Sequence, residues 1–539
     1  MPWILRRIAR TDIGLSMRLP TIAVMLVALL VTGGAGAMAG DARDGLLFTR
    51  HDGLSGAGRV VADWLARARS HGLLLVSVST VDPVVAAWVA DPGNGRPGTL
   101  TTQLAVERAL DNALAYLVAE LPPAPRTTPV LSDAATGFYN SPDITWRGTP
   151  LRVPSPEALA AARDAARDGR LDAYLTGLLP AHPQYLRLVA AAERYAGICA
   201  SGGWGVVAAP RIGKKKGWLP PPEVAQVLQT RLAREGYYPP PGTPPSGVWD
   251  ADTEAALAVY RAARQVPAKG IDDPDLIAAL AVPCEARLAT LELNVQRWRV
   301  TAWQREPTFV EVNVAAQELR YVRDHELVMT QRTIVGATKW YFDKDLKRRL
   351  NLHATPILSD HISRIVVNPI WAVPPKIAKN EIDLEVAKDP TYLERHRIQL
   401  VTSERGRTYI QSPGPDNALG VIKILFPNDE SVYLHDTPKK GAFRLAVRAL
   451  SHGCVRVQNA VDFGVALLRA DAEVAGRPFD EPAVRSRAGR GGSVVIDLTV
   501  EVPVFLEYYT ASVDDAGTVR FHPDIYAYDA EVIGAGAAR

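Results

Sequence analysis

Apolar residues recur at spacings of three and four from about residue 45 to residue 200, which is the period of an amphipathic helix. They are Val106, Leu110, Leu114 and Leu117 and, after the helix start Ser155-Pro156-Glu157, Leu159, Leu171, Leu175 and Leu178. No titratable cluster stands out in this region. We therefore expect a helical scaffold domain over residues 40–210.

A second helical segment follows the linker RIGKKKGWLPPPE, residues 211–223. Its pattern predicts a helix that ends at Gly236, a proline-rich loop with a turn at Gly247, and a second helix that begins at Asp250 or Asp252. We expect a small helical domain over residues 217–283, and a plain helical linker domain is the alternative.

From about residue 299 the period changes to the alternation that is typical of strands. Val310 and Val312 share one face while Glu311 and Asn313 take the other, which predicts a half-buried strand. Short strands continue with few helices between them, which favours a mainly antiparallel sandwich or barrel over residues 299–500.

Two further segments belong with this predicted sandwich. A charged helical stretch at about residues 375–410 interrupts the strands and is a candidate lid. Residues 501–539 are expected to pack, as a C-terminal extension, on the sandwich or on the scaffold. The predicted fold class is therefore multidomain α+β.

The first 39 residues have the pattern of an export signal. Arginines at positions 6, 7, 10 and 18 precede an apolar run from Ile22 to Val31, and Ala37-Met38-Ala39 has the form that a signal peptidase recognises. The run is shorter than the roughly 20 residues of a spanning helix. We expect cleavage after Ala39 and a periplasmic protein. An uncleaved inner-membrane anchor and a start at Met17 instead of Met1 are the alternatives.

Composition excludes some classes of protein. A chain of 539 residues is too long for one hydrophobic core, so we expect three or four folding units. The 61 Lys and Arg residues against 58 Asp and Glu residues give a net charge of +3, which does not favour a nucleic-acid partner. No cofactor is implied, and the histidines and cysteines show no metal-ligand spacing.

The three cysteines raise a question of chemistry, because an exported chain with an odd number leaves one thiol over. Cys199 and Cys284 could pair and leave Cys454 free, and the sequence leaves this open. Cys454 lies in SHGCVRV, nineteen residues after His435. A catalytic thiol needs a nearby base, and Gly453 permits a tight turn that aims amides at one point. From composition alone, a structural cysteine is the commoner interpretation.

The complete string resembles the signature of the L,D-transpeptidase family: His435, fifteen intervening residues, Ser451-His452-Gly453-Cys454 and then Arg456. RIVVNPIWAVPPKI, SPGPDNALGVIKI, LLPAHPQY and the tail VPVFLEYYTASVDDAGTVRFHPDIYAYD are similar to its large multidomain branch. GVWDADTEAAL looks like part of the small three-helix peptidoglycan-binding domain that accompanies it, which implies a third helix within residues 217–283. The resemblance spans nearly the whole chain after the signal, and it implies a β-sandwich catalytic domain with a cysteine nucleophile.

The resemblance also implies roles for single residues. Cys454 would be the nucleophile and His435 its general base, oriented by the backbone carbonyl of Asp436. The amides of His452, Gly453 and Cys454 would stabilise the oxyanion. The expected substrate-binding residues are Ser451, Arg456 and Trp371. For Arg456 the alternative is to hold the turn, and for Trp371 it is packing.

The partners implied are peptidoglycan stem peptides. A donor tetrapeptide would lose its terminal D-alanine as the thioester forms, and an amine of a neighbouring stem would accept the acyl group. Acylation by carbapenems, a monomeric state and a role in cell-wall biogenesis and cell shape are also implied. The alternatives are an L,D-carboxypeptidase or cross-link hydrolase with the same cysteine, and a non-catalytic wall-binding protein.

Overall fold

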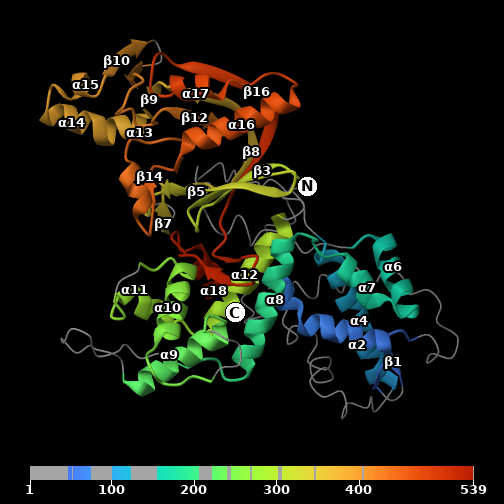
Figure 1. Cartoon of the computed structure of the whole chain (residues 1–539). Coiled ribbons are helices and arrows are strands. Elements are labelled where there is room, and N and C mark those ends of the chain that lie inside the picture. The colour runs from blue at the N-terminus through green and yellow to red at the C-terminus, as the bar shows by residue number, and fades with distance from the viewer. Residues whose placement is uncertain are drawn as a thin grey trace, which may run out of the picture. The chain divides into compact units, whose positions relative to one another are not determined.

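The computed structural model describes residues 46–50, 53–73, 100–122, 154–205, 221–238, 244–267, 270–301, 306–344, 348–403 and 406–537. They fall into two compact units, of which the first takes residues up to 66 together with 76–120 and 152–178 (Figure 1). The expected export signal and the lysine-rich linker lie outside the described residues. Among the helices that are described, none has both the length and the apolar character to cross a membrane.

The first unit is mainly helical. Its elements are β1 (Thr49–Arg50), β2 (Gly53–Leu54), α2 (Gly56–Ala66), α4 (Leu100–Glu120), α6 (Pro156–Arg167) and α7 (Leu171–Gly177). The predicted apolar face of α4 is confirmed, since Val106, Leu110, Leu114 and Leu117 are all buried. The predicted start of α6 is confirmed as well, because the Ser155 hydroxyl accepts a hydrogen bond of 3.1 Å from the Ala158 amide.

The second unit contains a pair of packed helices, α8 (Pro183–Ala200) and α12 (Cys284–Thr301), next to the short η1 (Ala68–His71). A disulfide between Cys199 and Cys284 joins the end of α8 to the start of α12 and leaves Cys454 as a free thiol. The pairing that the sequence left open is therefore formed. The expected scaffold range of residues 40–210 is shared between the two units, because α8 belongs to the second.

Three helices lie between the two cysteines, α9 (Pro222–Glu235), α10 (Ala251–Ala263) and α11 (Pro274–Ala281). As predicted, α9 ends at Gly236, which has a φ of +87°, a conformation that glycine adopts without strain. Asp250 is the residue that caps α10, since its carboxylate accepts from the Thr253 amide at 2.8 Å. Leu228, Leu232, Tyr260, Leu276 and Leu280 form the core of these three helices.

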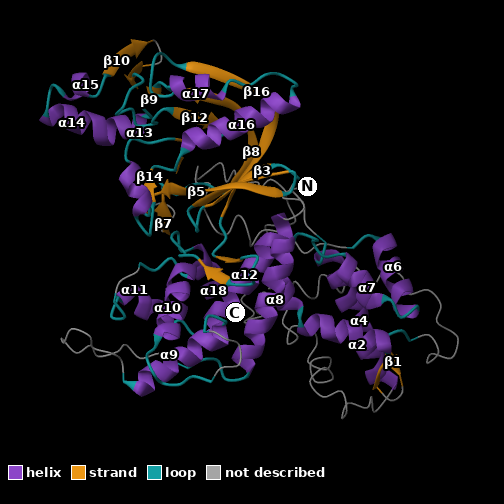
Figure 2. Cartoon of the chain, in the orientation of Figure 1, coloured by secondary structure: helices purple, strands orange, loops and turns teal. Residues whose placement is uncertain are grey.

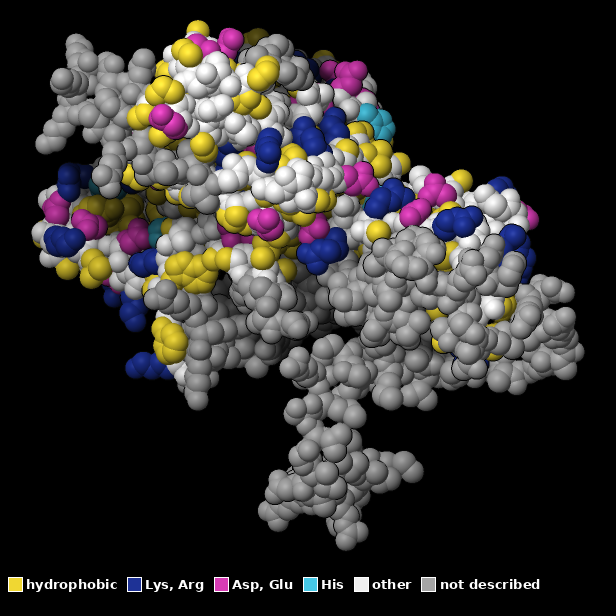
Figure 3. Space-filling view, turned by 90° about the horizontal axis from the view of Figure 1, so that it is seen from below, with side chains coloured by type: hydrophobic (Ala, Val, Ile, Leu, Met, Phe, Trp, Pro, Cys, Tyr) yellow, Lys and Arg dark blue, Asp and Glu magenta, His cyan; other side chains and the backbone are white. Residues whose placement is uncertain are grey.

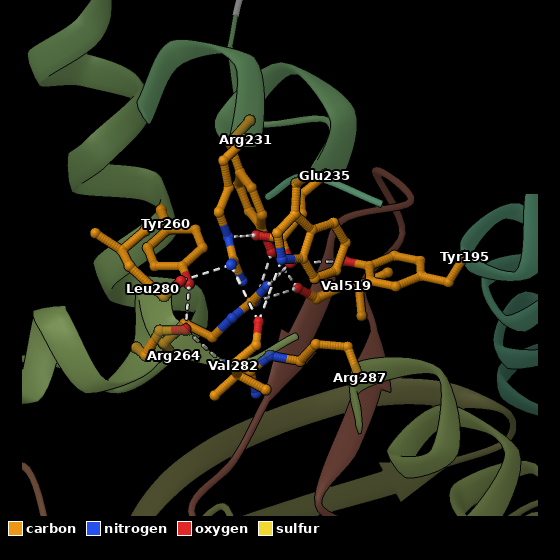
Figure 4. Close-up of polar contacts among 12 residues, drawn as sticks. Tyr195, Arg231, Glu235, Tyr260, Arg264, Leu280, Val282, Arg287 and Val519 are labelled. Carbon is orange, nitrogen blue, oxygen red and sulfur yellow. Dashed lines mark hydrogen bonds and ion pairs between the residues drawn. The ribbon is translucent and has the colours of Figure 1, made fainter. Parts of the chain in front are cut away.

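A buried polar cluster around Glu235 ties the three helices to their neighbours (Figure 4). The Glu235 carboxylate accepts from Arg264 at 2.9 Å and from the Tyr195 hydroxyl of α8 at 3.3 Å, and it pairs with Arg231 at 3.4 Å. Arg264 also donates to the backbone oxygen of Val519 at 3.1 Å. The three-helix domain is thus fixed to α8 and to the C-terminal part of the chain by buried hydrogen bonds.

The strands gather in the C-terminal part of the second unit, whereas the elements described from α8 to α12 are all helices (Figure 2). Nine strands form one sheet in the order β14-β5-β15-β13-β12-β8-β16-β3-β4, and β4 also pairs with β5, so the sheet closes on itself. The bounds are β3 (Phe309–Asn313), β4 (Glu318–Arg323), β5 (Glu326–Gly336), β8 (Leu358–Val367), β12 (Ile422–Leu425), β13 (Leu434–His435), β14 (Ala449–Ser451), β15 (Val455–Val457) and β16 (Val494–Glu507). The expected multidomain α+β fold class is confirmed.

The interior of this closed sheet is apolar and is shared with one long helix, α16 (Ala460–Val474). Val310, Ile365, Leu434 and Val455 contribute from the strands, and Phe463 contributes from α16. Burial of apolar area at about 25 cal/mol per Å² is the main force that holds these strands together. This part of the chain also contains η4 (Lys440–Arg444), α17 (Glu481–Arg487) and a two-stranded sheet of β6 (Trp340–Asp343) and β7 (Arg348–Asn351).

The prediction that β3 is half-buried was wrong. All five of its residues are buried, including Glu311 and Asn313, which were expected to face solvent. β3 lies between β16 and β4, and the chain after β16 covers its polar face. The Asn313 side chain is satisfied there by the backbone of Tyr509, to whose oxygen it donates at 3.0 Å.

The C-terminal segment connects the sheet to the helices. β16 runs to Glu507, across the boundary expected at residue 500, and is followed by the hairpin β17 (Ala511–Val513) and β18 (Val519–Phe521) and by α18 (Tyr528–Ala537). Tyr509 stacks on Trp298 of α12 with ring centroids 4.8 Å apart. Val513, Val519 and Phe521 join the core of α8 and α12.

The candidate lid is a small α+β element with its own core. It comprises β9 (Trp371–Ala372), α13 (Pro375–Ile377), the π-helix η3 (Ala378–Ile382), α14 (Asp383–Lys388), α15 (Tyr392–Arg395), β10 (Ile398–Ser403) and β11 (Gly406–Gln411). β10, β11 and β9 form a separate three-stranded sheet, so the lid is less helical than its sequence suggested. Val373, Ile382, Ile398 and Tyr409 are buried in its core.

On the face shown in Figure 3, basic and acidic side chains are interspersed over the described surface. This distribution agrees with the near balance of 61 basic and 58 acidic residues in the sequence.

Candidate active site

The turn that holds Cys454 joins β14 to β15 in the closed sheet. β15 pairs in parallel with β13, and in this register Leu434 lies opposite Val455 and His435 lies opposite Arg456. Cys454, one residue before β15, therefore lies beside the strand that ends in His435. The thiol is partly exposed, and its sulfur lies 3.9 Å from the backbone oxygen of Ser431. The sheet thus brings the two predicted catalytic residues to neighbouring strands.

The turn itself is held by short polar contacts. The Ser451 hydroxyl donates to the Cys454 backbone oxygen at 2.5 Å and accepts from the Gly453 amide at 3.2 Å. Gly453 has a φ of +120°, which side-chain-bearing residues rarely adopt. Thr355 fixes the turn from outside by donating to the Gly453 oxygen at 2.8 Å.

These contacts bear on two of the expected roles. Ser451 is only 2% exposed and its hydroxyl is used within the turn that holds Cys454, so it positions that turn; a contact between Ser451 and substrate stays a prediction. The Gly453 amide is engaged by Ser451, which leaves the amides of His452 and Cys454 as the oxyanion donors that this turn can offer.

His435 is buried, and its imidazole is oriented by the backbone as expected. Nδ1 lies 2.5 Å from the Asp436 backbone oxygen, so Nδ1 carries the proton of the neutral ring, and a backbone hydrogen bond with Leu419 also acts on the imidazole. The Asp436 carboxylate turns the other way, accepting from the Val421 amide at 3.1 Å and pairing with Lys440. Gly420 permits this approach, because a Cβ there would lie 2.4 Å from the Asp436 carboxylate.

The environment keeps His435 neutral. Burial, and after it the positive charge of Arg456, lower the pKa of His435 to about 3. The hydrogen bond with the Asp436 carbonyl acts in the opposite direction and raises this pKa. Burial also raises the pKa of the Cys454 thiol, while hydrogen bonds from Tyr433 and the charges of Lys423 and Arg456 lower it. Both groups are therefore uncharged at neutral pH, which suits a base that takes the thiol proton as the sulfur attacks.

Lys423 and Tyr433 are site residues that the sequence did not reveal. Lys423 on β12 is the register partner of His435, which puts Lys423, His435 and Arg456 in one row on the same face of three adjacent strands. The Lys423 Nζ lies 3.7 Å from the centre of the Tyr433 ring, and the nearby Cys454 sulfur, through its charge and a hydrogen bond, adds to the rise that burial causes in the pKa of the Tyr433 hydroxyl. Only the strand pairing reveals this row, since Lys423 is 31 residues from Cys454 in the chain.

His452 connects the turn to the lid. Its Nε2 lies 2.6 Å from a carboxylate oxygen of Glu381 in η3, and both side chains are partly exposed. The His452 ring also lies against His353, with centroids 4.7 Å apart, and His353 in turn contacts the Tyr341 hydroxyl at 3.2 Å. His452, two residues before Cys454, is thus connected to the lid through its contact with Glu381.

Trp371 and Arg456 occupy different positions. Trp371 pairs with Gln411 in the small sheet and packs against the core of the lid, which is the alternative that the sequence analysis left open. Arg456 lies in the row beside His435, and its Nε is buried without a hydrogen-bond partner. Within the described residues, no group of three or more His, Cys, Asp or Glu side chains is placed to hold a metal ion.

Two ranges of the chain match models of known protein families. Residues 307–464 match the model of the L,D-transpeptidase catalytic domain family, and residues 222–280 match the family described as "Putative peptidoglycan binding domain". The first range contains His435 and Cys454, and the second contains the three helices between the disulfide-bonded cysteines.

One similar curated protein comes from Haemophilus influenzae and is described as "Putative L,D-transpeptidase". It is 28% identical over 261 residues, which cover 45% of this chain and 48% of the relative. The chain thus spans about half the length of this relative.

Two solved structures are similar in part. The Ldtfm–avibactam carbamoyl enzyme is 12% identical, with 38% of this chain and 49% of that chain covered and a TM-score of 0.18. The L,D-transpeptidase of Xylanimonas cellulosilytica is 16% identical, with 56% and 98% covered and a TM-score of 0.18. Scores this low carry no argument about the site.

Proposed function

We propose that this chain, which combines an L,D-transpeptidase catalytic domain with a peptidoglycan-binding domain, is a peptidoglycan L,D-transpeptidase that works through a cysteine thioester. The observation that carries the proposal is that a free, partly exposed thiol at Cys454 precedes the strand β15, which pairs with the strand that ends in a neutral, backbone-oriented His435. A degenerate, purely wall-binding domain has no need of this arrangement.

In the first half of the reaction, Nε2 of His435 takes the Cys454 proton as the sulfur attacks the carbonyl of the third stem residue. The amides of His452 and Cys454 stabilise the oxyanion. The tetrahedral intermediate collapses with cleavage of the C–N bond, and His435 returns the proton to the departing amine of D-alanine. The product is a thioester between Cys454 and the donor stem.

In the second half, an amine of a neighbouring stem attacks the thioester and gives its proton to His435. The C–S bond breaks, the new amide is the cross-link, and Cys454 regains its proton. Water in place of the amine would give a carboxypeptidase, or a hydrolase if the donor is already a cross-link. The lid, tied to the turn through Glu381 and His452, is the feature that favours transfer, because it limits access of water.

The proposal extends to location and partners. Export to the periplasm is supported by the pattern of the first 39 residues and by the disulfide between Cys199 and Cys284, which persists in an oxidising compartment. Donor tetrapeptide stems and amine-bearing acceptor stems are the proposed substrates. Acylation by a carbapenem, a monomeric state and a contribution to cell shape belong to the same proposal.

The deciding experiment incubates purified protein with tetrapeptide muropeptides and separates the products by mass. The proposal requires dimers and free D-alanine from the wild type, and neither product from Cys454→Ala. Trimmed monomers without dimers would show the carboxypeptidase instead. Turnover that persists in Cys454→Ala, with binding to peptidoglycan retained as the control for folding, would refute the cysteine mechanism.

A further inference from the structure

Two cations flank the base in the row across the sheet. Lys423 lies on one side of His435 and Arg456 on the other, each its direct partner in a neighbouring strand. Side chains at such positions have Cβ atoms about 4.5–5.5 Å apart. Any group bound at the His435 nitrogen is therefore within reach of a lysine and an arginine that approach from opposite sides.

Both cations are partly withdrawn from water, and neither forms an ion pair with a carboxylate among the described residues. The Arg456 Nε is buried and makes no hydrogen bond, and Lys423 is held against the Tyr433 ring. Cys454 is the acidic group that acts on both cations, and Glu381 also acts on Arg456, but the Cys454 thiol is uncharged in the resting protein and the Glu381 carboxylate is engaged by His452. Burial lowers the pKa of both cations.

Such an arrangement is costly unless something compensates for it. A partly desolvated cation is stabilised by an anion with matched hydrogen bonds, and the guanidinium group in particular fits a carboxylate. The groups near the row, the Cys454 thiol, His435 and the Tyr433 hydroxyl, carry no negative charge at neutral pH. The compensating anion is therefore to be sought in the substrate.

We propose that Lys423 and Arg456 form a subsite for the α-carboxylate of the amino acid whose amine sits on His435. The inference rests on the proposed function and names the part of the substrate that the site recognises. In the first half-reaction this amino acid is the departing terminal D-alanine, whose carboxylate is one carbon away from the amine that His435 protonates.

The same subsite serves the second half-reaction by symmetry. An acceptor whose side chain ends in an amine and a carboxylate on the same carbon presents the same pair of groups as the departing D-alanine. Its amine takes the position on His435, and its carboxylate takes the position between Lys423 and Arg456. Primary amines without that carboxylate are therefore poor acceptors.

The test uses the reactivity of Cys454 itself, so that it does not depend on turnover. Iodoacetate and iodoacetamide both alkylate the thiolate with loss of iodide, and they differ in that only iodoacetate carries a carboxylate. The ratio of their rates cancels the fraction of thiolate and reports recognition of the carboxylate. The variants are Lys423→Met and Arg456→Met, with Lys423→Arg as the charge-retaining form and the exposed Lys439→Met as the matched control.

We expect the ratio to fall about tenfold in Lys423→Met and in Arg456→Met, the change that loss of one charge-assisted hydrogen bond produces. Lys423→Arg should retain most of the ratio and Lys439→Met all of it. An unchanged ratio in Lys423→Met would overturn the proposal. If Lys423→Met lowers the alkylation rates of iodoacetate and iodoacetamide by the same factor, the proposal is also overturned, because Lys423 then changes only the reactivity of the thiol.

A second arm compares a tetrapeptide donor with its C-terminal amide. The wild type should prefer the free acid about tenfold, and Lys423→Met should not distinguish the two. Equal use of both donors by the wild type would contradict the subsite. If neither donor is turned over, the proposed function fails, while the alkylation ratio still decides whether the carboxylate site exists.

Discussion

Replacing Glu235 by glutamine should release the three-helix domain from the rest of the second unit. The substitution keeps the shape of the side chain and removes its charge. Glu235 is 2% exposed and pairs with Arg264 at 2.9 Å and with Arg231 at 3.4 Å, and both arginine side chains are buried as well. A third arginine, Arg287, lies nearby, and burial followed by the charge of Arg264 lowers its pKa.

The magnitude follows from the burial of these charges. Removing one partner of a buried ion pair costs about 3–5 kcal/mol, because the other charge stays in a medium that cannot solvate it. Here the glutamine leaves Arg231 and Arg264 without a carboxylate in the cluster. The same energy shifts an opening equilibrium by roughly two to three and a half orders of magnitude. The domain should therefore open far more often before the sheet unfolds.

Hydrogen exchange of the amides in α9 and α10 measures this opening directly, and urea unfolding measures the total loss. Glu223→Gln on the same helix is the matched control, since Glu223 is exposed and should change stability by less than about 0.5 kcal/mol. If Glu235→Gln costs less than about 1 kcal/mol and leaves exchange in α9 unchanged, the reasoning from buried charge is refuted.

Three further predictions concern pH, the lid and the disulfide. The pKa of His435 is about 3 in the folded chain and about 6.5 in the unfolded one, so its contribution to stability is complete above pH 6.5 and is lost as the pH falls toward 3. The rate of acylation of Cys454, measured by stopped flow, should likewise show no ionisation near pH 6.5. A break in the pH profile there would contradict a base that is neutral at that pH. Glu381→Gln should raise the share of hydrolysed product, although by no more than a few fold, because a partly exposed pair with His452 is worth less than about 1 kcal/mol; an unchanged product ratio would separate the lid from this contact. Cys199→Ser with Cys284→Ser should lower the free energy of unfolding by about 4–5 kcal/mol in the chain-entropy account of a loop of 85 residues, and urea curves that coincide with the wild type would exclude that account.

Local signals in the sequence were sufficient for the helices and the turn. The buried face of α4 follows from its period, the cap of α10 from Asp250, and the tight conformation at Gly453 from the absence of a side chain. The resemblance of the string from His435 to Arg456 was sufficient to place the catalytic domain. Each of these features depends on residues close together in the chain.

Features that depend on pairing between distant strands could not be read in advance. Lys423 enters the site because β12 lies next to β13, and Asn313 is buried because the chain after β16 covers β3. The role of Ser451 became visible only with the geometry of the turn, in which its hydroxyl is already used. Register and side-chain direction are set by the whole sheet, which no short segment encodes.

The disulfide at the base of the three-helix domain has a consequence for proteolysis. Cys199 and Cys284 enclose the entire range that matches the peptidoglycan-binding family, residues 222–280. A protease that cuts once between the two cysteines breaks the backbone but leaves both fragments in one covalent molecule. The three-helix domain can thus be cut without being lost, and the disulfide would have to be reduced before a single cut could divide the chain into two molecules.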